Sequence, residues 1–107
     1  MEVGINMTKI SPYQEFTEAE FEKLDLYSKA IANVHGKNHP ELNQVRELFL
    51  TIQSKSAGVV GVKPDLDEEF KTLQTVTHDY DVPADGCETY QATYDLLQQA
   101  EIAYSKS

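Results

Sequence analysis

The stretch Thr75–Tyr94, T-V-T-H-D-Y-D-V-P-A-D-G-C-E-T-Y-Q-A-T-Y, decides how the second half of this chain folds. It completes one apolar pattern of helical period, contains a proline and a glycine, and then opens a second helical pattern. Pro83 disfavours helical backbone in the residue before it. We therefore predict that one helix ends near Tyr80 and that the next begins at Pro83 or Asp85. The stretch also contains Cys87, the only cysteine of the chain.

Outward from this stretch, apolar residues recur at helical spacing in four segments. The predicted helices are Thr17 to about His35, Pro40 to near Gly58, Asp65 to about Tyr80, and Pro83 or Asp85 onward. Their predicted buried faces are Phe21, Leu24, Tyr27 or Ser28, Ile31 and Val34; Leu42, Val45, Leu48 or Phe49 and Ile52; Leu66, Phe70, Leu73, Val76 and Tyr80; and Cys87, Tyr90, Tyr94, Leu97, Ala100 or Glu101 and Tyr104. Mostly short connections between such helices predict an all-α fold, an antiparallel four-helix bundle.

The predicted helix ends rest on capping signals. Thr17 with Glu20, and Asp65 with Glu68, have the spacing of capping boxes, in which two side chains satisfy backbone N–H groups of the first turn. Gly36 is the expected stop of the first helix, because glycine adopts left-handed backbone without a steric penalty.

Two segments favour extended backbone instead. Residues 1–12 alternate weakly between apolar and polar side chains, and we predict an extended N-terminal arm, residues 1–16, before a bundle of residues 17–107. The loop Val59–Val62 is rich in β-branched residues, so we expect it to cover one end of the core or to pair with the arm.

The charge of the chain limits its partners. It has 107 residues, 18 acidic and 9 basic, and a net charge of −9. Nucleic acids and anionic membrane surfaces both need clustered Lys and Arg, so we expect neither as a partner. No apolar run is long enough to span a bilayer and no signal peptide is evident, which predicts a cytoplasmic protein. A protein partner or a homodimer is the expected assembly, and the sequence names no ligand.

The histidines do not form a recognisable metal motif. His35 and His39 have the spacing of a helical metal pair, but Gly36 and Pro40 place them in a loop between helices, so their rings would not share a helical face. His78 lies near a predicted helix end. No Glu-x-x-His pair of the kind that holds di-iron centres occurs in the chain. We predict no metal site and no cofactor within one chain, with these three histidines as the candidates if there is one.

Cys87 and the tyrosines each have two interpretations. Cys87 at the start of the fourth helix is either a small apolar residue of the core, which we favour, or a thiol activated by the helix N-terminus. Tyrosines recur on the apolar faces, which favours a semi-polar core over a face that docks onto another subunit. These tyrosines are Tyr27, Tyr80, Tyr90, Tyr94 and Tyr104.

Two stretches resemble the iron–sulfur-cluster-repair di-iron proteins, a hemerythrin-like family. The first is V-H-G-K-N-H-P-E-L-N-Q-V-R-E-L-F, Val34–Phe49, which is similar to the family's H-G-x-x-H-P-E-L segment. The second is the stretch quoted first, which is similar to T-x-D-Y-x-x-P-x-x-A-C-x-T-Y-x-x-x-Y. Its matching residues are Thr77, Asp79, Tyr80, Pro83, Cys87, Thr89, Tyr90 and Tyr94, and Gly86 stands where the family usually has alanine.

The resemblance implies a hemerythrin-like bundle, but the ligand positions of the family are not matched. Its H-x-x-x-E type motifs fall at the ends of the second and fourth helices, where this chain reads S-K-S-A-G, residues 54–58, and A-E-I-A-Y-S-K-S, residues 100–107. The third helix begins D-L-D-E-E-F without a histidine. We therefore expect a non-catalytic binding or regulatory protein related to cluster repair or nitrosative stress. The alternatives are a metalloprotein with an iron or zinc site between subunits, and a thiol sensor centred on Cys87.

Overall fold

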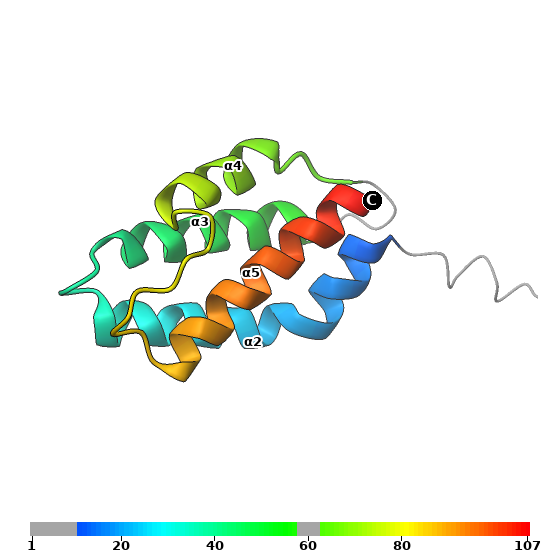
Figure 1. Cartoon of the computed structure of the whole chain (residues 1–107). Coiled ribbons are helices and arrows are strands. Elements are labelled where there is room, and N and C mark those ends of the chain that lie inside the picture. The colour runs from blue at the N-terminus through cyan, green and yellow to red at the C-terminus, as the bar shows by residue number, and fades with distance from the viewer. Residues whose placement is uncertain (1–10, 58–62) are drawn as a thin grey trace, which may run out of the picture.

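The computed structural model describes residues 11–57 and 63–107, and within them all regular secondary structure is α-helical. The helices are α2 (Pro12–His35), α3 (Glu41–Ser56), α4 (Asp67–Val76) and α5 (Glu88–Lys106) (Figure 1). The predicted all-α class is thus confirmed for the described residues. None of these helices is long and apolar enough to cross a lipid bilayer.

The first helix begins five residues earlier than predicted. Ser11 is its N-cap, and the Ser11 hydroxyl accepts the backbone N–H of Gln14 at 3.0 Å. Thr17 is therefore inside the helix, where its hydroxyl donates to the carbonyl of Gln14 at 2.8 Å, and the predicted cap at Thr17 is wrong. Residues 12–16, predicted as part of an arm, are helical. The remainder of that arm before Ser11, and the loop Val59–Val62, lie outside the described residues.

One end of the bundle is closed by two buried tyrosines. The Tyr13 N–H donates to the Ser107 hydroxyl at 3.0 Å, and the Tyr13 hydroxyl lies 2.7 Å from that of Ser56. The Tyr104 hydroxyl accepts the N–H of Leu66 at 2.8 Å. The start of α2, the end of α3, the start of α4 and the end of α5 therefore meet at this end (Figure 1).

Most of the predicted core is confirmed. The buried apolar residues are Tyr13, Phe21, Leu24, Ile31, Leu42, Val45, Phe49, Ile52, Leu66, Phe70, Leu73, Tyr90, Tyr94, Leu97, Ala100 and Tyr104. Val34 was predicted to be buried but is 73% exposed, and Cys87 is also exposed. Tyr13 was not predicted, because it precedes the expected helix start. Burial raises its pKa to about 12, so the ring stays neutral in the core.

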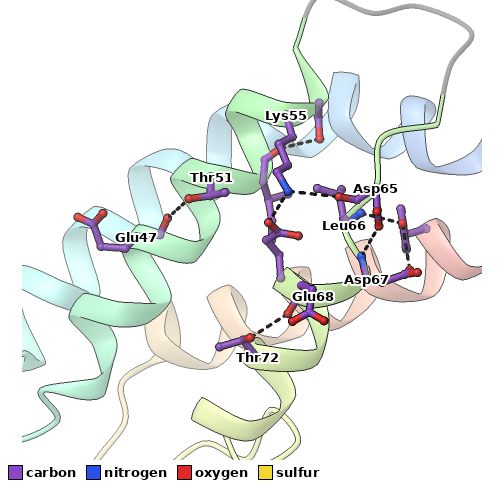
Figure 2. Close-up of polar contacts among 12 residues, drawn as sticks. Glu47, Thr51, Lys55, Asp65, Leu66, Asp67, Glu68 and Thr72 are labelled. Atoms are coloured by element: carbon purple, nitrogen blue, oxygen red, sulfur yellow. Dashed lines mark hydrogen bonds and ion pairs between the residues drawn. The ribbon is translucent and has the colours of Figure 1, made fainter.

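Polar contacts join α3 to the start of α4 (Figure 2). The Lys55 ammonium donates to the Glu69 carboxylate at 2.6 Å and to the Asp65 carbonyl at 3.4 Å. Asp65 also accepts the N–H of Asp67 at 3.4 Å, but the N-cap of α4 is Leu66 and it makes no side-chain cap bond. The predicted capping box of Asp65 with Glu68 is therefore wrong. The Lys55–Glu69 ion pair joins the start of α4 to α3.

Helix α4 ends at Val76, four residues earlier than predicted, and a left-handed turn follows it. His78, Asp79 and Tyr80 have φ values of 53, 63 and 64°. Left-handed backbone costs about 1–2 kcal/mol per residue outside glycine. The turn therefore needs compensating contacts.

Thr77 and Tyr80 supply these contacts. The buried Thr77 hydroxyl donates to the Leu73 carbonyl at 2.6 Å and accepts the N–H of Tyr80 at 2.8 Å. The Tyr80 hydroxyl donates to the Glu101 carboxylate of α5 at 2.6 Å. Burial and this carboxylate both raise the pKa of Tyr80. The stretch that ends α4 is thus fixed to α4 itself and to α5.

Two positions are glycine because a side chain there would clash, and not because the backbone is left-handed. Gly36 has right-handed backbone, φ −61°, so the predicted left-handed stop is wrong; a Cβ there would lie 2.3 Å from the Ala32 carbonyl oxygen. At Gly86 a Cβ would lie 2.6 Å from the Val82 side chain and 3.1 Å from the Pro83 carbonyl oxygen. This crowding accounts for glycine at the position where the resembling family usually has alanine.

Replacement of Thr77 tests the turn. Thr77→Val keeps the shape but removes the hydroxyl, which leaves the Tyr80 N–H without its partner. We expect the free energy of unfolding to fall by about 1–3 kcal/mol. Urea unfolding followed by circular dichroism measures this. Thr77→Ser keeps the hydroxyl and should lose clearly less; a valine variant as stable as the serine variant would contradict the role of the hydroxyl.

Candidate functional site

The end of the bundle opposite the two closing tyrosines gathers the polar side chains of chemical interest. His35 is the last residue of α2, and His39 lies just before α3. Both rings pack against Tyr90 of α5, with ring centroids 5.2 and 5.8 Å from that of Tyr90. The Tyr90 ring is fully buried beneath them. We call His35, His39, Glu41, Asp85 and Cys87 the histidine cluster.

His39 is the centre of an ion-pair network. Its Nε2 lies 3.0 Å from both carboxylate oxygens of Asp85, and its Nδ1 lies 3.4 Å from the Glu41 carboxylate. The hydrogen bond to Asp85 raises the pKa of His39, and Glu41 adds to this. The same bond lowers the pKa of Asp85. The pair ties the α2–α3 loop to the segment before α5.

His35 contacts the thiol. Its Nε2 lies 3.3 Å from Cys87 Sγ, and Cys87 is the exposed N-cap residue of α5. The favoured interpretation of Cys87 as a core residue is therefore wrong. The side chain sits just before the first helical turn, one position outside the buried face that begins at Tyr90.

The structure brings together two of the three candidate histidines. His35 and His39 flank the α2–α3 loop, as predicted, and their rings meet the same tyrosine. His78 lies in the left-handed turn after α4 and, in the described part of the chain, is not hydrogen-bonded to the other two rings, but it lines a pocket next to them. Sequence reasoning missed the partner of His39, Asp85, which lies 46 residues away along the chain. No local spacing could have indicated it.

A pocket lies beside the histidine cluster. Its volume is about 200 Å³, and it opens between the start of α3, the left-handed turn and α5. The residues that line it are Glu41, Val76, Thr77, His78, Asp81, Pro83, Tyr90 and Tyr94. It therefore uses both of the stretches that carry the family resemblance.

The bundle interior does not fit the di-iron centre that the resemblance implies. Such a centre needs inward carboxylates and imidazoles. In the described part of the chain the fully buried polar residues besides tyrosine are Ser28, Thr77 and Thr93, which all carry hydroxyls, and the carboxylates of Glu20 and Glu69 are only partly buried. Residues 11–57 and 63–107 also contain no group of three or more His, Cys, Asp or Glu arranged to hold a metal ion. No chemical step through iron follows from these residues.

Comparison with known proteins gives one distant relationship. The chain is 25% identical to iron–sulfur cluster repair protein ScdA from two strains of Staphylococcus epidermidis, over an alignment of 122 positions. The alignment covers 85% of this chain and 54% of each relative, so the chain spans about half the length of the curated relatives it matches. No family model matches the chain. No solved structure matches it either.

The His39–Asp85 pair predicts a pH-dependent stability. The pKa of His39 is raised in the folded state, so its contribution is complete below its ordinary value of about 6.5 and is lost as pH rises through the raised value. Asp85, with its lowered pKa, contributes above about 3.8 and loses this as pH falls. The stability difference between wild type and Asp85→Asn should be largest at about pH 5–6 and smaller at about pH 9.

Thermal unfolding across this pH range, with an NMR titration of the His39 ring, measures both effects. In Asp85→Asn the pKa of His39 should move toward the ordinary histidine value. A stability difference that stays constant from about pH 5 to 9 would show that the ion pair is absent in solution.

The exposure of Cys87 is directly testable by thiol labelling. We expect a disulfide reagent such as dithiobis(nitrobenzoate) to label the folded protein completely, at a rate within about tenfold of that in urea, because the thiol is accessible. His35→Gln should change the rate at which Cys87 is labelled in the folded protein and leave the labelling rate in urea unchanged. Labelling that requires unfolding would restore the core interpretation.

Proposed function

We propose that this chain is a non-catalytic helical module that binds and regulates another protein in iron–sulfur cluster repair, without a di-iron site of its own. Its arrangement is an antiparallel, hemerythrin-like bundle. The proposal combines the similarity to the ScdA proteins, over most of this chain, with an interior whose fully buried residues, in the described part of the chain, include no Asp, Glu, His or Cys.

The observation that carries the proposal is the composition of the interior. Leu24, Val45, Phe49, Tyr90 and Leu97 are each at most 1% exposed. A close-packed interior of this kind stabilises a fold, and its fully buried residues in the described chain include no carboxylate, imidazole or thiol. The activity of such a module is expected on its surface, by association.

The residues that match the family motif support this function through their structural roles. Thr77 and Tyr80 hold the left-handed turn, and Tyr90 and Tyr94 pack together with ring centroids 5.1 Å apart. Among the eight residues that match the motif, Asp79 and Cys87 are exposed. The similarity therefore rests largely on residues that shape the bundle and not on residues that perform chemistry.

The competing function is a metalloprotein whose iron or zinc site forms between subunits. The observation that favours it is the histidine cluster, because His35, His39 and Cys87 lie at one end of the bundle and are only partly covered. A second copy could add ligands there. Metal content and solution mass of the protein purified without a histidine tag separate the two functions.

A genetic test addresses the proposal directly. Deletion of the gene should slow the recovery of iron–sulfur dehydratase activity after nitric oxide exposure, because a component of repair is lost. The wild-type gene and a triple variant, His35→Gln/His39→Gln/His78→Gln, should restore recovery equally. Lys37→Gln, an exposed change in the same α2–α3 loop, is the matched control.

Two results would contradict the proposal in different ways. Unchanged recovery in the deletion strain would remove the link to cluster repair. Failure of the triple variant, with its helical circular dichroism intact and with stoichiometric metal present only in wild type, would establish the metalloprotein function instead.

A further inference from the structure

The pocket beside the histidine cluster contains a polar group that the protein leaves unsatisfied. Tyr90 lines the pocket and is 0% exposed, and its hydroxyl makes no hydrogen bond in the described part of the chain. The Tyr94 hydroxyl partly offsets the rise that burial causes in the pKa of Tyr90, but no hydrogen bond of normal geometry joins the two hydroxyls. A buried polar group without a partner costs about 1–3 kcal/mol. A bound group that completes this hydrogen bond would recover that cost.

The remaining lining determines the charge of such a group. Glu41 and Asp81 place two carboxylates at the pocket, and the Glu41 carboxylate also faces His39 Nδ1 at 3.4 Å. His78 lines the pocket as well, and no Lys or Arg does. The rings of Tyr90 and Tyr94 form aromatic walls. Carboxylates attract a cation and exclude an anion, and aromatic faces attract an organic cation through their quadrupole.

The size of the pocket limits the ligand to a few non-hydrogen atoms. About 200 Å³ is below the usual range for drug-sized ligands, about 300–1,000 Å³. We propose that this pocket binds a small organic ammonium group. Its N–H groups donate to the Tyr90 oxygen and to the carboxylates of Glu41 and Asp81, and its alkyl chain packs against Val76 and Pro83.

The shared chemistry has two sources, a free primary amine and the lysine side chain of a partner protein. A metal ion is a poorer occupant, because residues 11–57 and 63–107 hold no group of three ligating side chains with metal geometry. The inference does not depend on the role in cluster repair, since it rests on the pocket alone.

The test is an NMR titration of the isotope-labelled full chain with n-butylammonium chloride at about pH 8, which lies above the ordinary histidine pKa of about 6.5 and below the value of about 10.4 for an alkylammonium group. We expect saturable shifts of the amides of residues 77–81, 90 and 94, with a dissociation constant in the millimolar range. Nα-acetyl-lysine-methylamide tests the side-chain source in the same way. Sodium butyrate, which matches the ionic strength, and 1-pentanol, which matches the size, should cause no saturable shift.

Variants locate the binding. Tyr90→Phe keeps the ring but removes the hydroxyl, and should weaken amine binding about tenfold while the protein stays as stable or becomes more stable. Glu41→Gln and Asp81→Asn should weaken binding as well, and Glu22→Gln, an exposed change on α2, should not. The proposal is overturned if neither amine gives saturable shifts, if pentanol binds as well as butylammonium, or if Tyr90→Phe binds the amine as tightly as wild type.

Discussion

The hydroxyl of Thr77 makes the contact on which the second half of this bundle depends. It donates to the carbonyl of Leu73 and accepts the N–H of Tyr80, and it acts together with backbone bonds from Asp79 N–H to Gln74 and from Asp81 N–H to Thr77. The reversal requires three consecutive residues in left-handed backbone, which is costly for side chains other than glycine. The structure offsets this with the Thr77 bonds and with the bond from Tyr80 to Glu101 of α5. Without the reversal, α4 would continue and Tyr80 would not meet α5.

A second set of contacts joins the α2–α3 loop to the segment before α5, at the end of the bundle opposite the closing tyrosines. The rings of His35 and His39 cover Tyr90, and His39 binds Asp85 across the gap between the α2–α3 loop and the start of α5. Within the described chain the two rings pack on a buried tyrosine, and one of them is also paired with a carboxylate. The same packing buries the Tyr90 hydroxyl without a partner and leaves a pocket at its side.

The sequence predicts the helices and the buried faces well, because helical period and glycine or proline breaks are local signals. It fails where a non-local contact decides. The early start of α2 depends on Ser11 and on Tyr13, whose backbone and hydroxyl bond to the ends of α5 and α3. The early end of α4 depends on positive φ angles at three residues, none of which is a glycine.

The candidate site shows the same division between local and distant information. The histidines were predicted in their loop, but the contact of His39 with Asp85, 46 residues away, and the pocket arise only when distant segments of the chain meet. Cys87 was placed in the core because it lies at helical spacing before Tyr90, yet the helix begins one residue after it. Its contact with His35 could not be read from spacing.

Within the stretch Thr75–Tyr94, α4 ends at Val76 and residues 78–80 form a left-handed turn in place of a longer helix. NMR measurement of the backbone φ angles of His78, Asp79 and Tyr80 in the labelled protein tests this turn most directly. Positive φ at all three residues, seen as strong contacts between each amide proton and its own Hα, is the predicted result. Negative φ at all three, with helical chemical shifts continuing to Tyr80, would contradict the turn, the pocket built on it and the proposed ligand together.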